Sequence, residues 1–517
     1  MHKPILAVTD WLDLQVARQP RKSAVADVQE TLTYEELSRR ARILGSQVSC
    51  PARSAVIICM DKSVNCFAAM LGVLYADCFY SVLDPELPKQ RLRCIATQLQ
   101  ALLCFTDRQN KAGAQTVFEA LGVRVLCVEE LLSSTVSFDE QLLKDRAQRS
   151  CDTDPMYCNF TSGSTGQPKG VLISQRSVLD FIPVFCDTMA LTQDEIFGNQ
   201  APFDFDVSVK DLYSALYLGA EVHLIPRAYF VNPVALMDYL TERQITTLVW
   251  AVSALIFVAA MRAFTYRVPA QVRRVIYSGE VLPLQQLKTW HRYLPQAQFT
   301  NVYGPTEITC NCTYYHLDEG DFERADLPIG RSFPNERVFL LDEQEQEITA
   351  PGFTGEICVA GTCLALGYIG AEGNHAFTPN PLNTLYKEMI YRTGDRGFYD
   401  AEGLLHYAGR KDFQIKYLGH RIELLEIERH CGALEQVSRC CCVYQSAKNR
   451  LALYYEGEAA EDMVRTALSE ALPSFMVPSL IYRLPALPLN PHGKIDRMAL
   501  QNNPALAEGK VQGDVAP

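Results

Sequence analysis

The residues from 161 to 170 read TSGSTGQPKG and form the densest group of side chains suited to chemistry in this chain. Glycines let backbone N–H groups turn toward one point, and hydroxyls and an ammonium add donors, so the composition is typical of a polyphosphate site. It is not a P-loop, because Pro168 precedes Lys169 and Gly170 follows it. Taken alone, such a run is also typical of a solvated linker. The predicted phosphate ligands are Thr161, Ser162, Gly163, Ser164, Thr165, Gly166 and Lys169.

Further strings of polar and small residues follow the same order as in one known family. They are LTYEEL (32–37), FDFDVS (203–208), NVYGPTE (301–307), GEICVAG (355–361), YRTGD (391–395), GRKDFQIKYLGHRIELLEIE (409–428) and LPLNPHGKIDR (487–497). With the phosphate loop, they resemble the adenylate-forming enzymes, which include acyl-CoA synthetases, luciferases and the adenylation domains of nonribosomal peptide synthesis. Within that superfamily the chain is most similar to stand-alone amino-acid ligases such as D-alanine–carrier-protein ligase.

The reaction that this resemblance implies brings two anions together, since a substrate carboxylate attacks the α-phosphate of ATP and displaces pyrophosphate. Cations and oriented donors are needed around the developing charge. Lys494 matches the catalytic lysine of the family, and Asp412 matches the hinge between its two domains. Glu307 matches the residue that helps to hold Mg²⁺, an ion that prefers carboxylate oxygens. The other residues that the resemblance assigns to ATP are Gly279, Glu280, Tyr303, Gly304, Thr306, Asp395 and Arg410.

Asp206 matches the aspartate that amino-acid adenylating relatives place in the FD element, so the resemblance implies the amino-acid branch. A substrate ammonium must be matched by an opposite charge when it loses water. Asp206 also stands where a helix N-cap is expected, and Asp204 is a competing candidate. Lys210 follows four residues later, about 40° around the same predicted helix. Lys210 could bind a side-chain carboxylate or carbonyl of the substrate, form an ion pair with Asp206, or point outward.

The remaining pocket residues are also assigned by the resemblance, and together they predict a fairly polar wall. They are Val207, Val249, Ile276, Ser278, Val302, Cys310 and Asn311. Ser278 and Lys210 depart from what an alanine enzyme would carry. We therefore expect a small-to-medium polar or acidic amino acid rather than a bulky aromatic one.

Length and patterning predict an α/β protein. Short β-branched runs at 55–59, 247–250 and 275–277 alternate with amphipathic stretches such as 285–293, which favours mostly parallel sheets flanked by helices. The resemblance implies a large N-terminal domain over 1–411 and a small mobile α/β domain over 412–501, and residues 502–517 are predicted to form a flexible tail.

Composition narrows the classes of partner. The net charge of −12 argues against a nucleic-acid surface. The 18 cysteines lack metal or disulfide spacing, which favours reduced, buried thiols in a cytoplasmic protein. The apolar stretch at 248–261 is too short to span a membrane, and no signal peptide is evident.

The sequence thus predicts an enzyme that uses ATP and Mg²⁺ to activate an amino acid as an aminoacyl adenylate. Because no carrier domain is expected after Arg497, the acceptor would be the phosphopantetheine thiol of a separate carrier protein. One alternative is an acyl-CoA ligase for a carboxylic acid without an amine. Another is a catalytically silent homologue that serves as a binding module.

Overall fold

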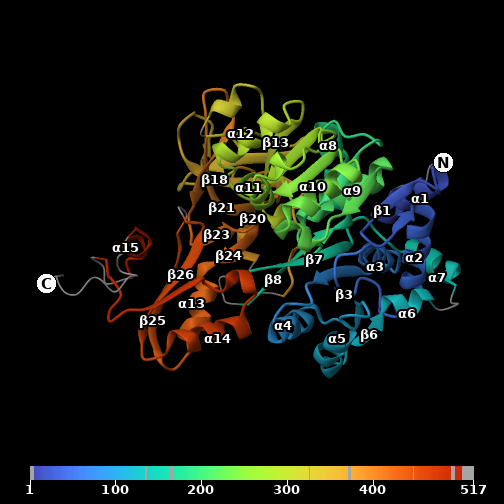
Figure 1. The fold of residues 1–517 in the computed structure, drawn as a ribbon, viewed down its shortest axis with the longest axis horizontal. Coiled ribbons are helices and arrows are strands. Elements are labelled where there is room, and N and C mark those ends of the chain that lie inside the picture. The colour runs from blue at the N-terminus through green and yellow to red at the C-terminus, as the bar shows by residue number, and fades with distance from the viewer. Residues whose placement is uncertain are drawn as a thin grey trace. The chain divides into compact units, whose positions relative to one another are not determined.

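The computed structural model describes residues 5–133, 137–163, 167–324, 326–370, 374–445, 448–490 and 495–502. The chain divides into two compact units (Figure 1). The first comprises the residues up to Pro85 together with 96–160 and 170–411. The second comprises 86–95, 161–169 and the chain from Asp412 onward.

A mixed sheet of nine described strands dominates the first unit. Its order is β15 (Arg331–Ser332), β14 (Thr313–His316), β13 (Gln298–Tyr303), β12 (Arg274–Ser278), β11 (Thr247–Ala251), β9 (Ile196–Asn199), β10 (Glu221–Leu224), β1 (Ser23–Ala26) and β2 (Thr31–Thr33). The strands from β13 through β1 run parallel, and antiparallel strands close both edges. The predicted runs at 247–250 and 275–277 are confirmed as parts of β11 and β12.

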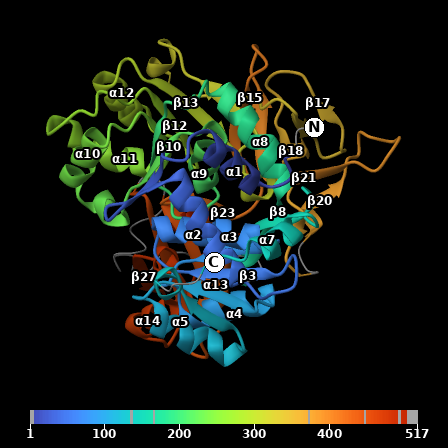
Figure 2. The same cartoon turned by 90° about the vertical axis from the view of Figure 1, so that its right-hand side faces the viewer.

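Both faces of this sheet are covered by helices, and the alternation of side chains shows how. Leu248, Trp250 and Val275 lie in a cluster with residues of α11 and α12, whereas Val249 and Ile276 lie in a cluster with residues of α8 and α9. Successive strand residues point to opposite faces, so the apolar runs are buried on both sides. Figure 2 shows the strands between these two layers of helices. The helices are α8 (Gln175–Thr188), α9 (Val207–Leu218), α10 (Pro233–Glu242), α11 (Val252–Ala260) and α12 (Leu284–Tyr293).

Two further sheets complete the first unit. The seven-stranded sheet contains β19 (Gly367–Tyr368), β8 (Lys169–Ser174), β7 (Pro155–Thr161), β4 (Phe79–Leu83), β3 (Ala55–Cys59), β5 (Leu103–Thr106) and β6 (Arg124–Cys127). The other contains β17 (Glu347–Ile348), β16 (Glu336–Leu341), β18 (Gly355–Gly361), β21 (Met389–Tyr399), β20 (Phe377–Pro379) and β22 (Leu405–Arg410). The N-terminal helices are α1 (Val8–Arg18), α2 (Tyr34–Ser46), α3 (Val64–Tyr75), α4 (Lys89–Leu99), α5 (Lys111–Phe118), α6 (Val128–Ser133) and α7 (Glu140–Ala147). The predicted α/β fold with parallel sheets is confirmed.

The second unit has its own core of small sheets and helices. Its elements are β23 (Gln414–Tyr417), β24 (His420–Glu423), α13 (Leu424–Gly432), β25 (Val437–Gln445), β26 (Arg450–Gly457), α14 (Glu461–Ala471), β27 (Leu480–Arg483) and α15 (Arg497–Asn502). Ile427 and Val464 from the two longer helices pack with Leu453 of β26 in one buried cluster.

The cysteines are reduced and mostly buried, as the sequence predicted. All 18 cysteines are free thiols, and most are buried. In the ranges given above, no helix combines the length and apolar character needed to cross a bilayer.

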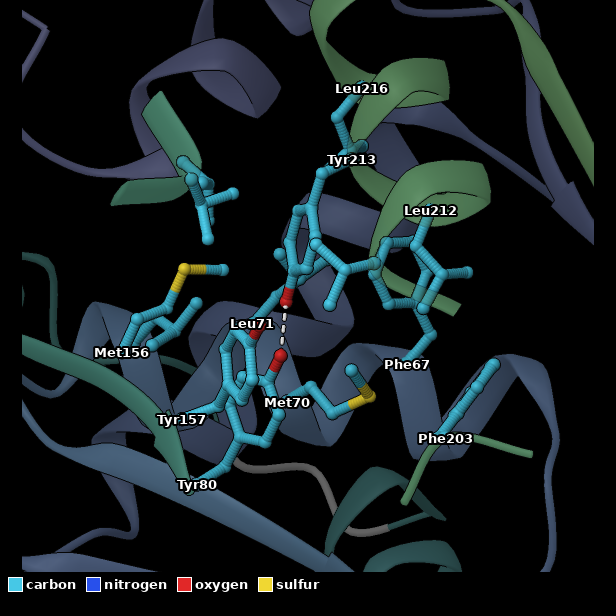
Figure 3. Close-up of a cluster of buried hydrophobic side chains, with 14 of the residues drawn as sticks. Phe67, Met70, Leu71, Tyr80, Met156, Tyr157, Phe203, Leu212, Tyr213 and Leu216 are labelled. Carbon is cyan, nitrogen blue, oxygen red and sulfur yellow. Dashed lines mark hydrogen bonds between the residues drawn. The ribbon is translucent and has the colours of Figure 1, made fainter. Parts of the chain in front are cut away.

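A buried aromatic cluster connects α3, the seven-stranded sheet and α9 (Figure 3). The hydroxyls of Tyr80 on β4 and Tyr213 on α9 share a hydrogen bond of 2.7 Å. Phe67 on α3 packs edge-on against Tyr213 and also contacts Phe203, with ring centroids 6.3 and 6.4 Å apart. The inner face of α9 is thereby held against α3 and β4.

Helices α2 and α3 cross at two glycines. A Cβ placed on Gly72 would lie 2.7 Å from the carbonyl oxygen of Ala41, and one on Gly45 would lie 2.7 Å from the carbonyl oxygen of Gly72. Both contacts are shorter than carbon and oxygen tolerate, and both involve backbone that cannot rotate away. Glycine is therefore required for this close crossing.

We predict that Gly72→Ala lowers the stability of the protein by about 1–3 kcal/mol, the usual cost of overpacking a dense core. The matched control is Gly113→Ala in α5, where a Cβ meets no atom within 4 Å. That change should be neutral or should stabilise by about 0.5–1 kcal/mol, since alanine favours a helix. Differential scanning calorimetry of both variants checks this, and equal melting temperatures would contradict it.

Candidate active site

The segment that carries Asp206 connects β9 to α9. Phe203, which is 4% exposed, anchors the segment in the aromatic cluster. Asp206 occupies the N-cap position of α9, but its side chain makes no capping hydrogen bond. The structure therefore does not use the Asp206 carboxylate as a helix cap. Burial raises the pKa of Asp204 to about 7, which disfavours the charged form of this competing carboxyl.

Lys210 is fully buried on α9 and donates a hydrogen bond of 2.5 Å to the Oδ1 atom of Asn311. Because Lys210 is 0% exposed, the predicted alternative of outward exposure is wrong, whereas an ion pair with Asp206 stays a prediction. Burial lowers the pKa of Lys210, and the nearby Cys310, Asp206 and Asp211 oppose that shift.

The predicted wall residues on the sheet share one face. Val249 pairs with Ile276 across β11 and β12, and Ile276 pairs with Thr300 on β13. Val302 stands two residues after Thr300 and therefore points the same way. Val249, Ile276 and Val302 pack in the same buried cluster as Cys310 and residues of α9. Ser278 is also on this face and is 5% exposed, whereas Val207 at the start of α9 is partly exposed.

The loop that presents Asn311 is strained. Thr309 and Cys310 have φ values of 57° and 78°, in the left-handed region that disfavours residues other than glycine. The Thr309 hydroxyl donates to the carbonyl oxygen of Cys363, and the Cys310 thiol donates to that of Asp206 at 3.0 Å. The second bond holds the loop against the segment that carries Asp206. No sequence pattern signals this conformation, because neither residue is glycine.

Gly304 makes room for the same loop. A Cβ at this position would lie 2.5 Å from the Cα of Asn311 and 2.6 Å from the carbonyl oxygen of Cys310. The glycine of the YGPTE string therefore permits a close approach of two backbone segments. Gly279, by contrast, has a φ of 103°, and a Cβ there would meet no atom. Glycine is favoured at this position by its backbone conformation and not by a lack of space for a side chain. The neighbouring Glu280 is partly exposed.

Asp395, predicted to bind ATP, is held by two neighbours. The Tyr303 hydroxyl donates to Oδ2 at 2.5 Å, and Arg410 forms an ion pair with Oδ1 at 2.6 Å. Arg410 stands opposite Asp395 in the pairing of β21 with β22. Burial and the adjacent Asp395 raise the pKa of Tyr303, so its hydroxyl stays protonated and donates. A carboxylate accepts about four hydrogen bonds, which leaves Asp395 able to accept more.

Glu307, predicted to help hold Mg²⁺, lies in the short helix Thr306–Ile308 and is 1% exposed. The hydroxyl of Tyr368 donates to its Oε1 atom at 2.7 Å, a contact that no sequence pattern indicated. Within the described residues no group of three or more His, Cys, Asp or Glu side chains could hold a metal. A single buried carboxylate fits Mg²⁺, which usually keeps waters and substrate phosphates as its other ligands.

Several predicted phosphate and catalytic residues lie outside the described ranges, namely Ser164, Thr165, Gly166 and Lys494. The described parts of the loop belong to the second unit. Thr161 ends β7 and Lys169 begins β8. A Cβ on Gly163 would lie 2.1 Å from the carbonyl oxygen of Gln167, so these two residues approach closely. Asp412 opens the C-terminal part of this unit, and its Oδ1 accepts a hydrogen bond from the amide of Gln414 at 3.2 Å.

The fold is that of an α/β protein with parallel sheets, and comparison with known families shows to which family the chain belongs. Residues 12–369 match the family described as AMP-binding enzyme. The chain belongs to this family of ligases.

Two relatives are similar to this chain over most of its length. The chain is 32% identical over 493 residues to the L-proline–[L-prolyl-carrier protein] ligase of Streptomyces coelicolor, with 90% of this chain and 91% of that protein covered. It is 33% identical over 528 residues to tyrocidine synthase 3 of Brevibacillus parabrevis, where 99% of this chain covers only 8% of the relative.

Solved structures share the fold. The adenylation domain AlmE of Vibrio cholerae in complex with glycyl-adenosine-5′-phosphate superposes with a TM-score of 0.84 at 22% identity, covering 97% of this chain and 98% of that one. PA1221, a nonribosomal peptide synthetase protein with adenylation and carrier domains, gives 0.82 at 24% identity, covering 96% of this chain and 84% of that one.

We predict that Tyr303→Phe weakens ATP binding while the fold is preserved. The change removes one hydrogen bond to the buried Asp395 carboxylate, and a bond to a charged acceptor contributes about 1.5–3 kcal/mol. The KM for ATP should rise about tenfold or more, with little change in the KM for the second substrate. Steady-state kinetics measure this, and an unchanged KM for ATP would show that Tyr303 does not orient the carboxylate.

Proposed function

We propose that this chain adenylates an amino acid with ATP and Mg²⁺ and transfers it to the phosphopantetheine thiol of a separate carrier protein. In the first step the substrate carboxylate oxygen bonds to the α-phosphorus, and the bond from that phosphorus to the α–β bridging oxygen breaks to release pyrophosphate. In the second step the carrier thiol attacks the carbonyl carbon, loses its proton, and AMP leaves. The observation that carries the proposal is that a carboxylate, Asp206, stands at the N-cap of α9 and a fully buried ammonium, Lys210, follows on the same helix.

Asp206 would bind the α-ammonium of the substrate. Its carboxylate is not used as a cap, and its own backbone oxygen accepts the Cys310 thiol, which holds the segment in place. An ammonium that leaves water needs a matching carboxylate, and Asp206, partly buried at the start of α9, would supply it. This argument favours an amino acid over an acid that lacks nitrogen.

Lys210 would bind the far end of the substrate side chain. An ammonium has three N–H donors, and in the described structure Asn311 accepts from one of them. A buried ammonium with unfilled donors favours a ligand that brings oxygen acceptors. A side-chain carboxylate supplies two such oxygens and an opposite charge, so the proposed substrate is a small-to-medium polar or acidic amino acid.

The remaining residues would bind the nucleotide. Asp395, which contacts Tyr303 and Arg410, would accept hydrogen bonds from ribose hydroxyls. Glu307 would hold Mg²⁺, which neutralises phosphate charge when bound. Lys494 would lie between the substrate carboxylate and the α-phosphate, where a cation relieves the repulsion of two anions. The loop over residues 161–169 would surround the pyrophosphate portion with backbone and hydroxyl donors.

Transfer to a carrier protein is supported by the relatives. The Streptomyces coelicolor protein that covers nearly the whole chain is a ligase named for its carrier protein. In two solved neighbours the adenylation domain is followed by a carrier domain, in one of them by artificial fusion.

We predict that ATP–pyrophosphate exchange is stimulated most by an acidic amino acid in a panel of L-, D- and β-amino acids and simple carboxylic acids. Asp206→Ala should lower kcat/KM for that amino acid about 100-fold or more, since an unpaired buried charge costs about 3–5 kcal/mol. Lys210→Met should lower it for the acidic amino acid but not for an apolar one of similar size. The KM for ATP is the internal control in both variants.

Other outcomes of this experiment distinguish the alternatives. Exchange only with carboxylic acids that lack an amine, unaffected by Asp206→Ala, would replace the proposal with an acyl-CoA ligase. No exchange with any acid would indicate a silent homologue. If exchange with an amino acid is unchanged in Lys210→Met, the proposed amino-acid function stands and the proposal of an acidic substrate is contradicted.

We predict that Asp412→Pro leaves adenylate formation largely intact and impairs thioester formation. The proposal needs the C-terminal residues to change conformation between the two steps, and proline removes a backbone donor and fixes φ near −65° at the first residue of that segment. Pyrophosphate exchange measures the first step, and loading of radiolabelled amino acid onto a carrier protein measures the second. Equal loss of both activities would contradict a hinge at this position.

A further inference from the structure

Lys62 lies between β3 and α3, far in sequence from the substrate segment, and its ammonium is surrounded by backbone oxygens. Its Nζ atom donates to the carbonyl oxygens of Asn199, Gln200 and Ala201 at 3.3, 3.0 and 3.4 Å, and to the Oδ1 atom of Asn199 at 3.0 Å. Three consecutive carbonyl groups thus converge on one cation. A single ammonium fixes the direction of the chain over these residues, because each carbonyl must keep its orientation to accept.

The residues held in this way lead directly into the proposed substrate site. Asn199 ends β9, and the chain continues through Ala201 to Phe203 and Asp206. The side chain of Gln200 accepts a hydrogen bond from the amide of Ala251 at the end of β11, at 3.3 Å. The base of the segment is therefore tied both to Lys62 and to the neighbouring strand.

The side chain of Asn199 extends the same connection to α9. It accepts from Lys62 through Oδ1 and donates through Nδ2 to the Oδ2 atom of Asp211 at 2.8 Å. Asp211 is fully buried on α9, directly after Lys210, and its Oδ1 atom has no hydrogen-bond partner in the described structure. One amide thus bridges the partly buried Lys62 and the fully buried Asp211.

These charges depend on each other. Burial lowers the pKa of Lys62 to about 7, and the Asp211 carboxylate acts against that shift. Burial raises the pKa of Asp211 to about 7, while Asn199, Lys210 and Lys62 act against it. Loss of the Lys62 charge would leave Asp211 less well balanced beside Lys210.

We infer that Lys62 is a positioning residue for amino-acid recognition, which holds the segment carrying Asp206 and, through Asn199 and Asp211, the turn of α9 carrying Lys210. This inference rests on the proposed function, since it assigns to Lys62 the geometry of that same site. Lys62 touches neither of the two substrate-binding side chains in the structure and acts through the backbone and the bridging amide.

The chain offers a matched control at the opposite end of α9. Lys22 also donates to backbone carbonyls, those of Gln193 at 2.8 Å and Gly219 at 2.6 Å. Gln193 precedes β9, and Gly219 follows the last residue of α9. Lys22 therefore ties the same two elements at the ends that face away from Asp206. A merely structural role predicts similar effects for both lysines.

The test is steady-state pyrophosphate exchange with Lys62→Met, Lys62→Gln, Lys62→Arg and Lys22→Met in the full-length protein. Lys62→Met should raise the KM for the amino acid about tenfold, with the KM for ATP unchanged, and Lys62→Arg should restore most of the loss. Lys62→Gln, which keeps a donor, should lie between them and serves if the methionine variant does not fold. Lys22→Met should alter the melting temperature but neither KM.

Parallel increases in both KM values, or the same amino-acid effect in Lys22→Met, would overturn the inference and leave Lys62 a structural residue. Failure of the proposed function is visible separately, because the unmodified protein would then show no exchange with any amino acid.

Discussion

The structure around α9 depends on one constraint: charged side chains on this helix are buried and have lost their water. Lys210 and Asp211 are fully buried one residue apart, and Asp206 precedes them at the start of the helix. A buried ion is tolerated only when other groups replace the water that it has lost. The Asn311 amide serves Lys210, and the Asn199 amide serves Asp211. Much of the surrounding structure, from the strained loop at 309–310 to the distant Lys62, places those replacements.

The parallel sheet makes this arrangement possible. The carboxyl ends of β9, β11, β12 and β13 lie at one edge, so the segments that follow them meet there although they are far apart in sequence. One face of the strands supplies apolar wall residues and the other anchors the sheet to α10, α11 and α12. The position of Asn311 opposite Lys210 then needs only a loop that turns back, which the two left-handed residues and Gly304 provide.

Sequence reasoning predicted the class of fold, because β-branched runs such as those in β3, β11 and β12 have one stable arrangement when helices separate them. It also selected Asp206 and Lys210 as a group. It could not predict the hydrogen bond between Lys210 and Asn311, which joins residues 101 positions apart and depends on left-handed φ values at Thr309 and Cys310. The contacts of Lys62 and Tyr368 could not be predicted either, because their hydrogen-bond partners are distant in sequence and only the fold brings them together.

The charges of the pocket also bear on the order of events in catalysis. Asp206 and Lys210 cancel each other, so an acidic amino acid would place its ammonium and its side-chain carboxylate against opposite charges with no net change. Its α-carboxylate would then be the one charge that this helix does not balance, and an anion next to ATP phosphates is strongly disfavoured. That charge disappears when the acyl phosphate bond forms. In the proposed reaction a cation would therefore be needed there only until adenylation, whereas Asp206 and Lys210 would be needed for as long as the aminoacyl group remains bound. This difference in timing would favour separate placement of the two kinds of residue, with the substrate-binding charges at α9 and the proposed catalytic lysine, Lys494, in the C-terminal part of the sequence.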